Sequence, residues 1–404
     1  MNILFLTIST KITSDTEGGV YLDLLRKFRD HGHQVFVAAP AERRYREETQ
    51  LFEYGGITVL KIKTLNFQKT NLIEKGISTL LLEHQYSTQI FRFFKDIKFD
   101  LILYSTPPIT FSKLVSQIKK RDQAKSYLLL KDIFPQNAVD LGMMKKTGMI
   151  YHFFRRKEKQ LYRVSDHIGC MSPANVAYVL KHNPEIPIHK VEVNPNSIAP
   201  LTCEKDDLVR AEIRKKYNIP SQAVVVLYGG NLGKPQGLDF FSTMLSANRD
   251  REDCFFLIVG SGTEQKKLEA WVNENQPQNC RLLDMLPKED YSQLVHACDI
   301  GLVMLDKRFT IPNFPSRILS YLECKMPVLV VTDIHSDMGK IAEENQFGLF
   351  SVHGDIETFN INLNQYINNR KSIESMGMNG YQYLMANYTV DQSYQIIMKH
   401  FQKK

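Results

Sequence analysis

Residues 228–240 read YGGNLGKPQGLDF, a glycine-rich loop of the kind that can bind an anion. The loop follows residues 223–227, AVVVL, whose continuous apolar run is typical of a strand buried on both faces of a parallel sheet. Glycine lets the backbone turn sharply and approach a ligand, so that several N–H groups can point at it. The candidate ligand-binding residues of this loop are Gly229, Gly230, Lys234 and Gln236.

A second candidate site lies in residues 306–333, where prolines precede an expected helix at 317–325. Pro315 favours an extended backbone, and Ser316 is in position to be the N-cap of that helix. The first helical amides, the Ser316 hydroxyl and the Arg317 guanidinium would then lie together. The sequence therefore predicts a phosphate site at this helix start.

Two polar residues follow one turn further along the same expected helix. Ser320 and Glu323 stand three residues apart and therefore lie on neighbouring faces. A carboxylate there can accept hydrogen bonds from the two hydroxyls of a ribose. The alternative is that Glu323 is a solvated surface acid beside Arg317, its helical neighbour.

Two other glycine pairs come directly after expected strands. Gly18 and Gly19, preceded by Glu17, open a helix expected at 20–30, where backbone amides and the helix dipole favour negative charge. The alternative is a tight turn. This pair lacks the G-x-G-x-x-G spacing, so dinucleotide binding is not supported. Gly260, in VGSG, is equally compatible with a ligand site and with a structural turn.

Length and composition exclude several classes of protein. A chain of 404 residues predicts two α/β domains, and 43% hydrophobic with 24% charged residues is typical of a soluble globular protein. The N-terminus is expected to be a first strand and not a signal peptide, and no apolar run has membrane-spanning length. The six scattered cysteines include no C-x-x-C pair, which predicts a reducing cytoplasm without a disulfide framework or zinc site.

The formal net charge of +7 predicts an anionic partner. No nucleic-acid-binding module is present. Residues 145–163 and 65–99 mix lysines with aromatic and aliphatic side chains, a composition suited to an anionic membrane surface. The alternative is that the apolar residues belong to the core and the charges to a solvated face.

Strand-like and helix-like segments alternate along the whole chain, which predicts an α/β protein with doubly wound parallel sheets. A proline-rich polar stretch at 194–206 is typical of a linker between two Rossmann-like domains. Ligands of such sheets bind beyond the carboxyl ends of the strands, so we expect the loops of both domains to present the site to a cleft. The expected strands are 2–8, 34–39, 100–104, 126–130, 224–227, 254–259, 281–283, 300–305, 327–331 and 348–352.

Five motifs in this order resemble the retaining nucleotide-sugar glycosyltransferases of family four, which have the two-domain GT-B fold. The motifs are GGV, YGGNLGKPQGLDF, FFLIVGSGTEQKKLE, LPKEDYSQLVHACDIGLVML and PSRILSYLECKMPVL. KDIFPQNAVDLGMM and SPANVAYVLKHN are similar to the N-terminal acceptor domain of the branch that builds bacterial capsule and O-antigen units, including transferases of the N-acetyl-L-fucosamine type.

The resemblance implies a retaining transfer of a sugar, such as an N-acetylated amino or deoxy sugar, from a UDP-sugar to a lipid-linked saccharide. The lipid would be a polyprenyl diphosphate, and the enzyme would be cytoplasmic and peripheral at the inner face of the plasma membrane. No metal or other cofactor is implied. Residues 1–198 would bind the acceptor, with the helix-like segment 388–404 packing back on them, and residues 199–387 would bind the donor.

The chemistry of such a transfer, applied to the residues of this sequence, suggests their roles. Lys234 and Arg317 would stabilise the leaving diphosphate, and Asp132, after the expected strand 126–130, would act on the acceptor hydroxyl as a base or hydrogen-bond partner. Uracil would lie near Met285 and Leu286. The predicted donor-binding residues are Gly229, Gly230, Asn231, Lys234, Gln236, Gly260, Met285, Leu286, Pro315, Ser316, Arg317, Ser320 and Glu323, with Glu17, Gly18 and Gly19 as a loop for acceptor or phosphate.

This sequence departs from the family pattern at several of these positions. The acidic pair Glu-x7-Glu falls on Pro312 and Ser320, and we hypothesise that Glu323 takes the ribose role instead. The usual arginine and lysine correspond to Asn231 and Gln236. These losses leave two alternatives open: a nucleotide-sugar 2-epimerase of the same architecture, or a binding subunit that has lost catalysis.

Overall fold

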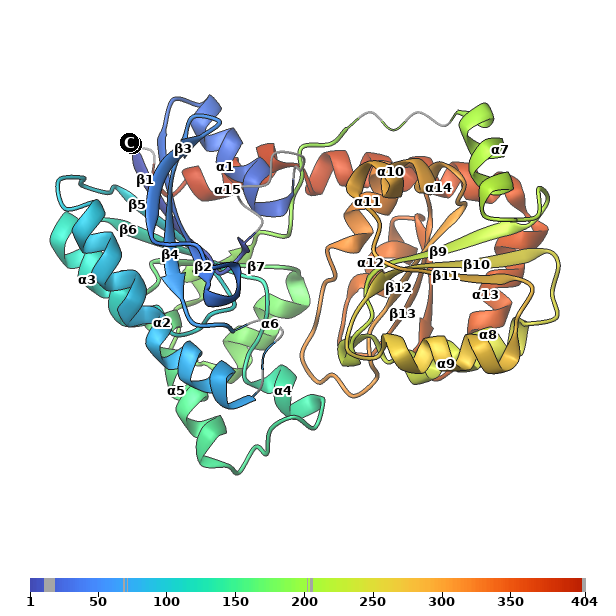
Figure 1. Cartoon of the computed structure of the whole chain (residues 1–404), viewed down its shortest axis with the longest axis horizontal. Helices are drawn as coiled ribbons and strands as arrows, with labels where there is room; N and C mark the ends of the chain where they lie inside the picture. The colour runs from blue at the N-terminus through green and yellow to red at the C-terminus, as the bar shows by residue number, and fades with distance from the viewer. Residues whose placement is uncertain (11–18, 68–69, 71, 202, 204–205, 402–404) are drawn as a thin grey trace. The chain divides into compact units, whose positions relative to one another are not determined.

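The computed structural model describes residues 1–10, 19–67, 70, 72–201, 203 and 206–401, and its contacts divide the chain into two compact units. Unit 1 comprises Met1–Ala199 together with Val390–Lys404, and unit 2 comprises Pro200–Thr389 (Figure 1). Each unit is built around its own sheet with helices on both faces. Each sheet therefore has its own edge of strand ends at which a ligand can bind.

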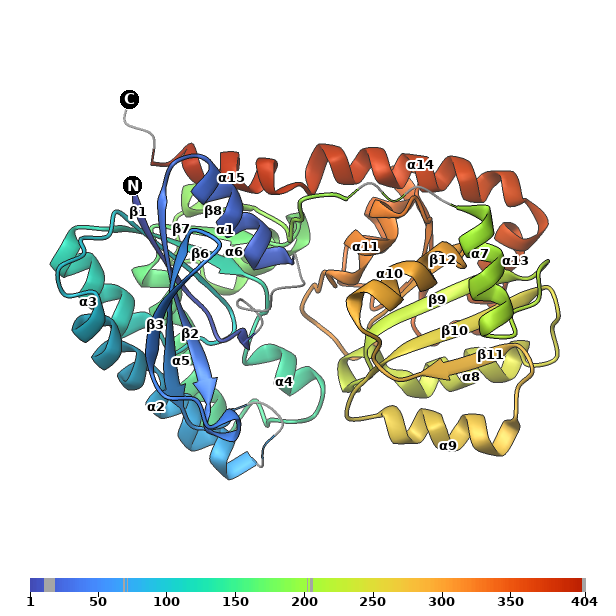
Figure 2. The same ribbon diagram turned by 45° about the horizontal axis from the view of Figure 1, so that its top comes forward.

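Unit 1 contains an eight-stranded sheet with the order β3-β4-β2-β1-β5-β6-β7-β8. Its strands are β1 Asn2–Leu6, β2 Gln34–Glu42, β3 Gln50–Tyr54, β4 Ile57–Thr64, β5 Leu101–Ser105, β6 Lys125–Leu130, β7 His167–Cys170 and β8 Val191–Val193. Its helices are α1 Val20–Asp30, α2 Leu72–Phe93, α3 Ser112–Asp122, α4 Gln136–Asp140, α5 Met149–Val164, α6 Pro173–His182 and α15 Val390–Met398, with 3-10 turns η2 Arg43–Tyr45 and η3 Ile188–Lys190. Helix α15 packs against α1, as Figure 2 shows.

Unit 2 contains a six-stranded sheet with the order β11-β10-β9-β12-β13-β14. Its strands are β9 Val224–Asn231, β10 Cys254–Ser261, β11 Cys280–Leu283, β12 Ile300–Met304, β13 Val328–Thr332 and β14 Gly348–Val352. Its helices are α7 Asp207–Lys216, α8 Leu238–Asn248, α9 Gln265–Asn275, α10 Lys288–His296, α11 Arg317–Glu323, α12 Met338–Glu344, α13 Ile356–Asn368 and α14 Arg370–Asn387, with the 3-10 turn η4 Lys234–Gln236. Side chains from α8, α9 and α13 share one hydrophobic core with the sheet.

The expectation of purely parallel sheets is wrong at one edge of unit 1. Strands β3 and β4 pair antiparallel, with Tyr54 opposite Ile57. Gly55 and Gly56 form the connection, both with positive φ, the backbone conformation that a two-residue hairpin requires. The other strand pairs of both sheets in the described part of the chain are parallel, as expected.

The strand order places the glycine loop at the switch point of the unit 2 sheet. Strand β9 lies between β10 and β12. From β9 the chain continues to β10 and β11 on one side of β9, and after β11 it crosses to β12 on the other side. In doubly wound sheets the crevice at such a point, outside the carboxyl ends of the strands, is where ligands bind. Because β9 ends at Gly230 and Asn231, the chain brings these residues to that crevice.

Close approach of two backbones explains Gly260. It pairs with Gly230 across β9 and β10, and a Cβ atom on Gly260 would lie 1.8 Å from the Gly230 carbonyl oxygen. We therefore expect Gly260→Ala to lower the free energy of unfolding of unit 2 by about 1–3 kcal/mol, because the backbone must shift. Urea unfolding followed by fluorescence of Trp271, the single tryptophan of the chain, measures this change.

The matched control is Ser261→Ala, which shortens the next side chain of the same strand. We expect its effect to stay within about 0.5 kcal/mol. Equal stability of Gly260→Ala and the wild type would contradict the close approach of the two strands.

Candidate functional site

The backbone amide of Gly229 is occupied, contrary to its expected availability for a ligand. Its N–H donates to the Tyr321 hydroxyl at 2.9 Å. The Tyr291 hydroxyl packs directly against Gly229, since a Cβ atom there would lie 2.0 Å from it. Gly229 is thus required so that two tyrosines can approach the strand. Anion binding by this loop stays a prediction, and it now falls on Gly230, whose φ of 124° favours glycine.

Arg317, the first residue of α11, lies beside this loop. Its guanidinium carbon is 4.4 Å from the centre of the Tyr228 ring and 3.7 Å from where a Cβ atom of Gly230 would be. Its Nη1 atom is buried and finds no hydrogen-bond partner among the residues that the structure describes. A buried guanidinium N–H without an acceptor is costly, so an anionic ligand at this place would complete the arrangement.

The surroundings of Arg317 keep it cationic. Burial alone lowers the pKa of the guanidinium, but Tyr228, Tyr321 and Tyr291 outweigh burial and raise that pKa above its ordinary value. The ring of Tyr228 adds a cation–π contact. A permanent positive charge at the switch point is suited to a phosphate group.

The expected helix cap at Ser316 is wrong. Ser316 has helical backbone angles, φ −66° and ψ −15°, and its side chain makes no capping hydrogen bond. An N-cap residue needs an extended backbone for its oxygen to reach the first amides, and Ser316 lacks it. Its side chain is exposed, and Pro315 beside it is partly buried. Both residues lie at the predicted place, but Ser316 does not have the predicted hydrogen bond.

The two polar residues of α11 are engaged within unit 2. The Ser320 hydroxyl donates to the Arg317 carbonyl oxygen at 2.9 Å. Glu323 ends the seven-residue helix, earlier than the expected end at 325, and its Oε1 accepts the Leu201 backbone N–H at 2.6 Å. Arg317 and Glu323 therefore lie at opposite ends of α11. Binding of ribose by Glu323 stays a prediction.

The 3-10 turn η4 forms the second wall of the glycine loop. Gln236 is buried, and its Oε1 accepts the Gly233 N–H at 3.1 Å and the Asn231 amide at 3.2 Å, so it shapes the loop. Lys234 is exposed. The Asp306 N–H donates to the Pro235 carbonyl at 2.9 Å, which joins this turn to the segment that leads to Arg317.

The remaining predicted residues lie after β11 in unit 2, before α1 in unit 1, or outside the described residues. Met285 is 58% exposed and Leu286 is partly buried, in the connection after β11. Gly19 precedes α1, and its carbonyl accepts the Asp23 N–H at 2.9 Å. Glu17 and Gly18 lie outside the described residues.

Asp132 follows β6 in unit 1 and is held by two neighbours. The Asn137 side-chain amide donates to both carboxylate oxygens at 2.8 Å. The Thr106 hydroxyl accepts the Asp132 N–H at 3.0 Å and fixes the backbone. Burial raises the Asp132 pKa to about 6, although the bonds from Asn137 and the Ile133 backbone lower it. A carboxyl with this pKa is suited to accept a proton near neutral pH.

Two groups close to Asp132 were not found from the sequence. Tyr21, in the first turn of α1, is partly buried and hydrogen-bonded to Ser105; burial and the Asp132 charge raise the pKa of its hydroxyl. Lys131 donates to the Asn194 carbonyl at 3.2 Å, and burial lowers its pKa to about 7. No spacing in the sequence links Tyr21 to Asp132, because the two residues belong to segments more than 100 residues apart in the chain.

Three tyrosines around Arg317, at positions 228, 291 and 321, were likewise missed. In the sequence each of them looks like an ordinary aromatic core residue. Only the tertiary structure brings them close to the guanidinium. Among the described residues no three His, Cys, Asp or Glu side chains form a metal-binding group. No helix in that part of the chain combines the length and apolar character needed to cross a membrane.

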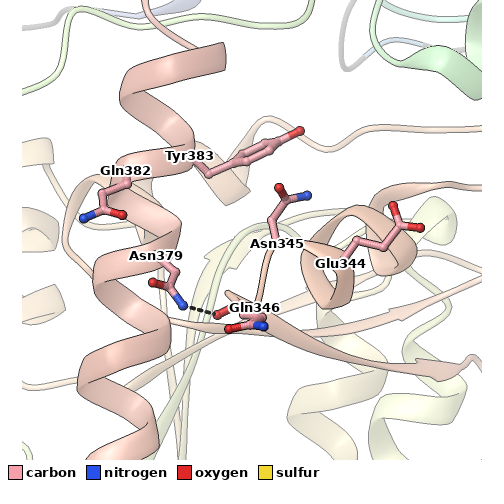
Figure 3. Close-up of a pocket in the computed structure, with 6 residues that line it drawn as sticks. All are labelled: Glu344, Asn345, Gln346, Asn379, Gln382 and Tyr383. Atoms are coloured by element: carbon pink, nitrogen blue, oxygen red, sulfur yellow. Dashed lines mark hydrogen bonds between the residues drawn. The ribbon is translucent and has the colours of Figure 1, made fainter.

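A surface pocket of about 310 Å³ lies elsewhere in unit 2, between the end of α12 and α14 (Figure 3). It is lined by polar side chains, and the Asn379 amide donates to the Gln346 carbonyl at 3.0 Å. The pocket contains none of the predicted site residues. It is therefore distinct from the switch-point site.

Comparisons with known proteins agree with this description. Residues 209–383 match the family described as Glycosyl transferases group 1. A relative from Pseudomonas aeruginosa, named "Probable glycosyltransferase WbjE", is 23% identical over 286 residues, which cover 69% of this chain and 68% of the relative. The structure of Anabaena HepE in complex with UDP and glucose has a TM-score of 0.72 at 16% identity, over 99% of both chains. WaaG, a glycosyltransferase involved in lipopolysaccharide biosynthesis, has a TM-score of 0.69 at 14% identity, over 98% of this chain and 99% of its own.

The fold is therefore GT-B, with two Rossmann-like parallel-sheet units, as the sequence resemblance implies. The match to the group 1 family lies within unit 2, and the chain is a glycosyltransferase of class EC 2.4. The expected fold class and enzyme class are confirmed.

The environment of Asp132 makes stability depend on pH. Its pKa in the folded protein, about 6, exceeds its ordinary value of 3.8, so ionisation disfavours the folded state above pH 6 and not below pH 4. We expect Asp132→Asn to raise the free energy of unfolding at pH 7.5 by on the order of 1–3 kcal/mol, and this gain to vanish towards pH 4. Thermal unfolding of both proteins across this pH range measures the difference.

Asp96→Asn, at an exposed carboxyl, is the control and should change stability little at any pH. A gain for Asp132→Asn that is equal at pH 4 and pH 7.5 would contradict a raised pKa.

Proposed function

We propose that this enzyme transfers a sugar, with retention of configuration, from a UDP-sugar to a lipid-linked saccharide during synthesis of a bacterial capsule or O-antigen polysaccharide. The observation that carries the donor part is the buried Nη1 of Arg317, which has no hydrogen-bond partner among the described residues and lies at the switch point. HepE with bound UDP and glucose supports a nucleotide-sugar donor, and WaaG supports a polysaccharide pathway.

In the proposed reaction the main task of unit 2 is to stabilise charge on the departing diphosphate. Arg317 supplies a fixed cation, because its ring contact with Tyr228 holds the guanidinium in place. The Gly230 backbone approaches the same point, and Lys234, exposed on the adjoining turn, can reach a phosphate oxygen. These groups supply positive charge without a metal ion, so we propose a metal-independent reaction.

Unit 1 is proposed to bind the acceptor. Breaking the sugar–phosphate bond and forming the new glycosidic bond releases one proton from the acceptor hydroxyl, and that proton needs a base or must leave with the diphosphate. Asp132 is the candidate base, oriented by Asn137 and Thr106. Retention and the N-acetylated sugar rest on the family resemblance, and NMR of the product anomer tests retention.

The missing acidic pair supports one other candidate function, a nucleotide-sugar-binding subunit without catalysis. Pro312 and Ser320 occupy the two positions where family four has glutamates, and the Ser320 hydroxyl donates to the Arg317 carbonyl. Turnover separates the two functions, since both bind a donor and only the enzyme releases the nucleoside diphosphate.

We expect the purified protein to bind one class of nucleotide sugar in a titration against UDP-, GDP- and dTDP-sugars. Arg317→Ala should weaken this binding by about 10- to 100-fold, because one charge-assisted contact to phosphate is lost. Isothermal titration calorimetry measures the affinity, and release of the diphosphate measures turnover.

Arg249→Ala, at an exposed arginine of the same unit, is the matched control and should bind normally. Glu323→Gln tests the ribose hypothesis. Weaker donor binding would support it, and unchanged binding would contradict it and assign Glu323 only the hydrogen bond to Leu201. Tight donor binding by Arg317→Ala would show that the site lies elsewhere.

A surface of unit 1 supports the proposed membrane partner. At the start of α5, Met149 is 89% exposed, Ile150 63% and Phe153 41%, and Lys145 and Lys146 precede them. Apolar side chains at this exposure together with lysines are suited to the headgroup region of an anionic bilayer. We propose that the enzyme is cytoplasmic and peripheral at the inner face of the plasma membrane, where a polyprenyl diphosphate acceptor would be presented.

We expect the protein to sediment with vesicles that contain phosphatidylglycerol and not with vesicles of phosphatidylcholine alone. Met149→Ser with Ile150→Ser should reduce binding roughly tenfold or more, because two apolar side chains no longer enter the bilayer. The matched control is Leu208→Ser with Ile361→Ser, which removes two exposed apolar side chains from unit 2. Equal loss with both pairs would contradict a surface on unit 1.

A further inference from the structure

The six cysteines fall into two groups by exposure. All six lie in the described part of the chain and carry thiols. Cys203 and Cys324 are partly exposed, whereas the other four are buried. The buried cysteines are Cys170, Cys254, Cys280 and Cys298. Only the two partly exposed thiols are accessible to a reagent in solution while the protein stays folded.

These two thiols are neighbours in unit 2. The side chain of Cys324 is hydrogen-bonded to that of Cys203, and this bond, with burial and the Glu323 charge, raises the Cys324 pKa well above its ordinary value. Cys324 follows the last residue of α11, and Cys203 lies in the segment between Ala199 and α7.

A second contact holds the same two segments together. The Leu201 N–H donates to the Glu323 carboxylate at 2.6 Å. Leu201 stands two residues before Cys203, and Glu323 directly precedes Cys324. Residues 201 and 203 therefore lie along the end of α11 in the same order as 323 and 324. The Leu201 contact thus holds the chain close to Cys203 at the same end of the helix.

We propose that Cys203 and Cys324 form a reversible disulfide. Under oxidising conditions this disulfide would link the segment before α7 to the end of helix α11. The oxidant is a small-molecule disulfide such as oxidised glutathione. The Cys203 sulfur, as thiolate, attacks one glutathione sulfur and releases one glutathione thiolate. The Cys324 sulfur, on losing its proton, then attacks Cys203 and releases the second. Two protein thiols give up two electrons and two protons, and one glutathione disulfide becomes two thiols.

The order of attack follows from the pair itself. The hydrogen bond to Cys203, burial and the Glu323 charge hold the pKa of the Cys324 thiol well above its ordinary value, so Cys324 keeps its proton. The first nucleophile is therefore Cys203, the thiol on the segment outside the helix, and Cys324 resolves the mixed disulfide.

The disulfide would restrain the helix that carries Arg317. Helix α11 has seven residues, so a bond at Cys324 fixes the far end of the element whose first residue lies at the switch point. The bond would also close a long loop that contains β9 to β12. A closed loop of this length reduces the freedom of the unfolded chain and raises the melting temperature of unit 2, by roughly 5 °C.

The test treats the full chain, without denaturant, with oxidised glutathione and then with dithiothreitol. We expect the intact mass to fall by two hydrogens on oxidation and to recover on reduction, and peptide mapping to find Cys203 joined to Cys324. The oxidised form should melt roughly 5 °C higher by Trp271 fluorescence. Cys280→Ala, at a buried cysteine, should behave as the wild type.

Cys203→Ser and Cys324→Ser should each abolish the loss of two hydrogens and the shift in melting temperature, and both variants keep a polar side chain at a partly exposed site, so folding is preserved. A stable glutathione adduct on Cys203 in the wild type, without closure to Cys324, would overturn the proposal. So would a disulfide that joins other cysteines, or no change of mass. None of these readouts depends on enzyme activity, so the proposed function can fail or hold independently.

Discussion

The arrangement of unit 2 depends on one partly buried cation, the Arg317 guanidinium over the Tyr228 ring. A charge away from water must find partners, and this one has aromatic faces on one side and an Nη1 atom without an acceptor among the described residues. Gly229 and Gly230 lack side chains where Tyr291 and the guanidinium approach the strand. The same requirement for close approach continues across the sheet to Gly260.

Unit 1 presents a complementary chemistry with a carboxylate in place of the cation. Burial raises the pKa of Asp132 to about 6, so that the carboxyl can exchange a proton near neutral pH. The hydrogen bonds from Asn137 limit this rise. The Asp132 charge in turn helps to raise the pKa of the Tyr21 hydroxyl, which belongs to a different element. In both units, burial and specific neighbours thus adjust an ionisable group near the carboxyl ends of the strands.

The sequence was informative where local patterns decide the structure. Helix α1 spans the expected residues 20–30, and the apolar runs of the parallel strands are at their expected places within a few residues. The hairpin of β3 and β4 and the short strands β7 and β8 were not expected. They were missed because short or half-exposed strands have weak periodicity and depend on pairing with distant segments.

The sequence by itself determined the α/β class, the parallel sheets, the glycine loop and the presence of an arginine at a helix start, because strand runs, glycines and prolines act locally on the backbone. The tertiary structure alone decided what those residues contact. It engaged the Gly229 amide with Tyr321, left Ser316 without a cap, turned Glu323 to Leu201 and gathered three tyrosines around Arg317. Hydrogen-bond partners and burial come from segments far apart in the chain, and no local pattern encodes them.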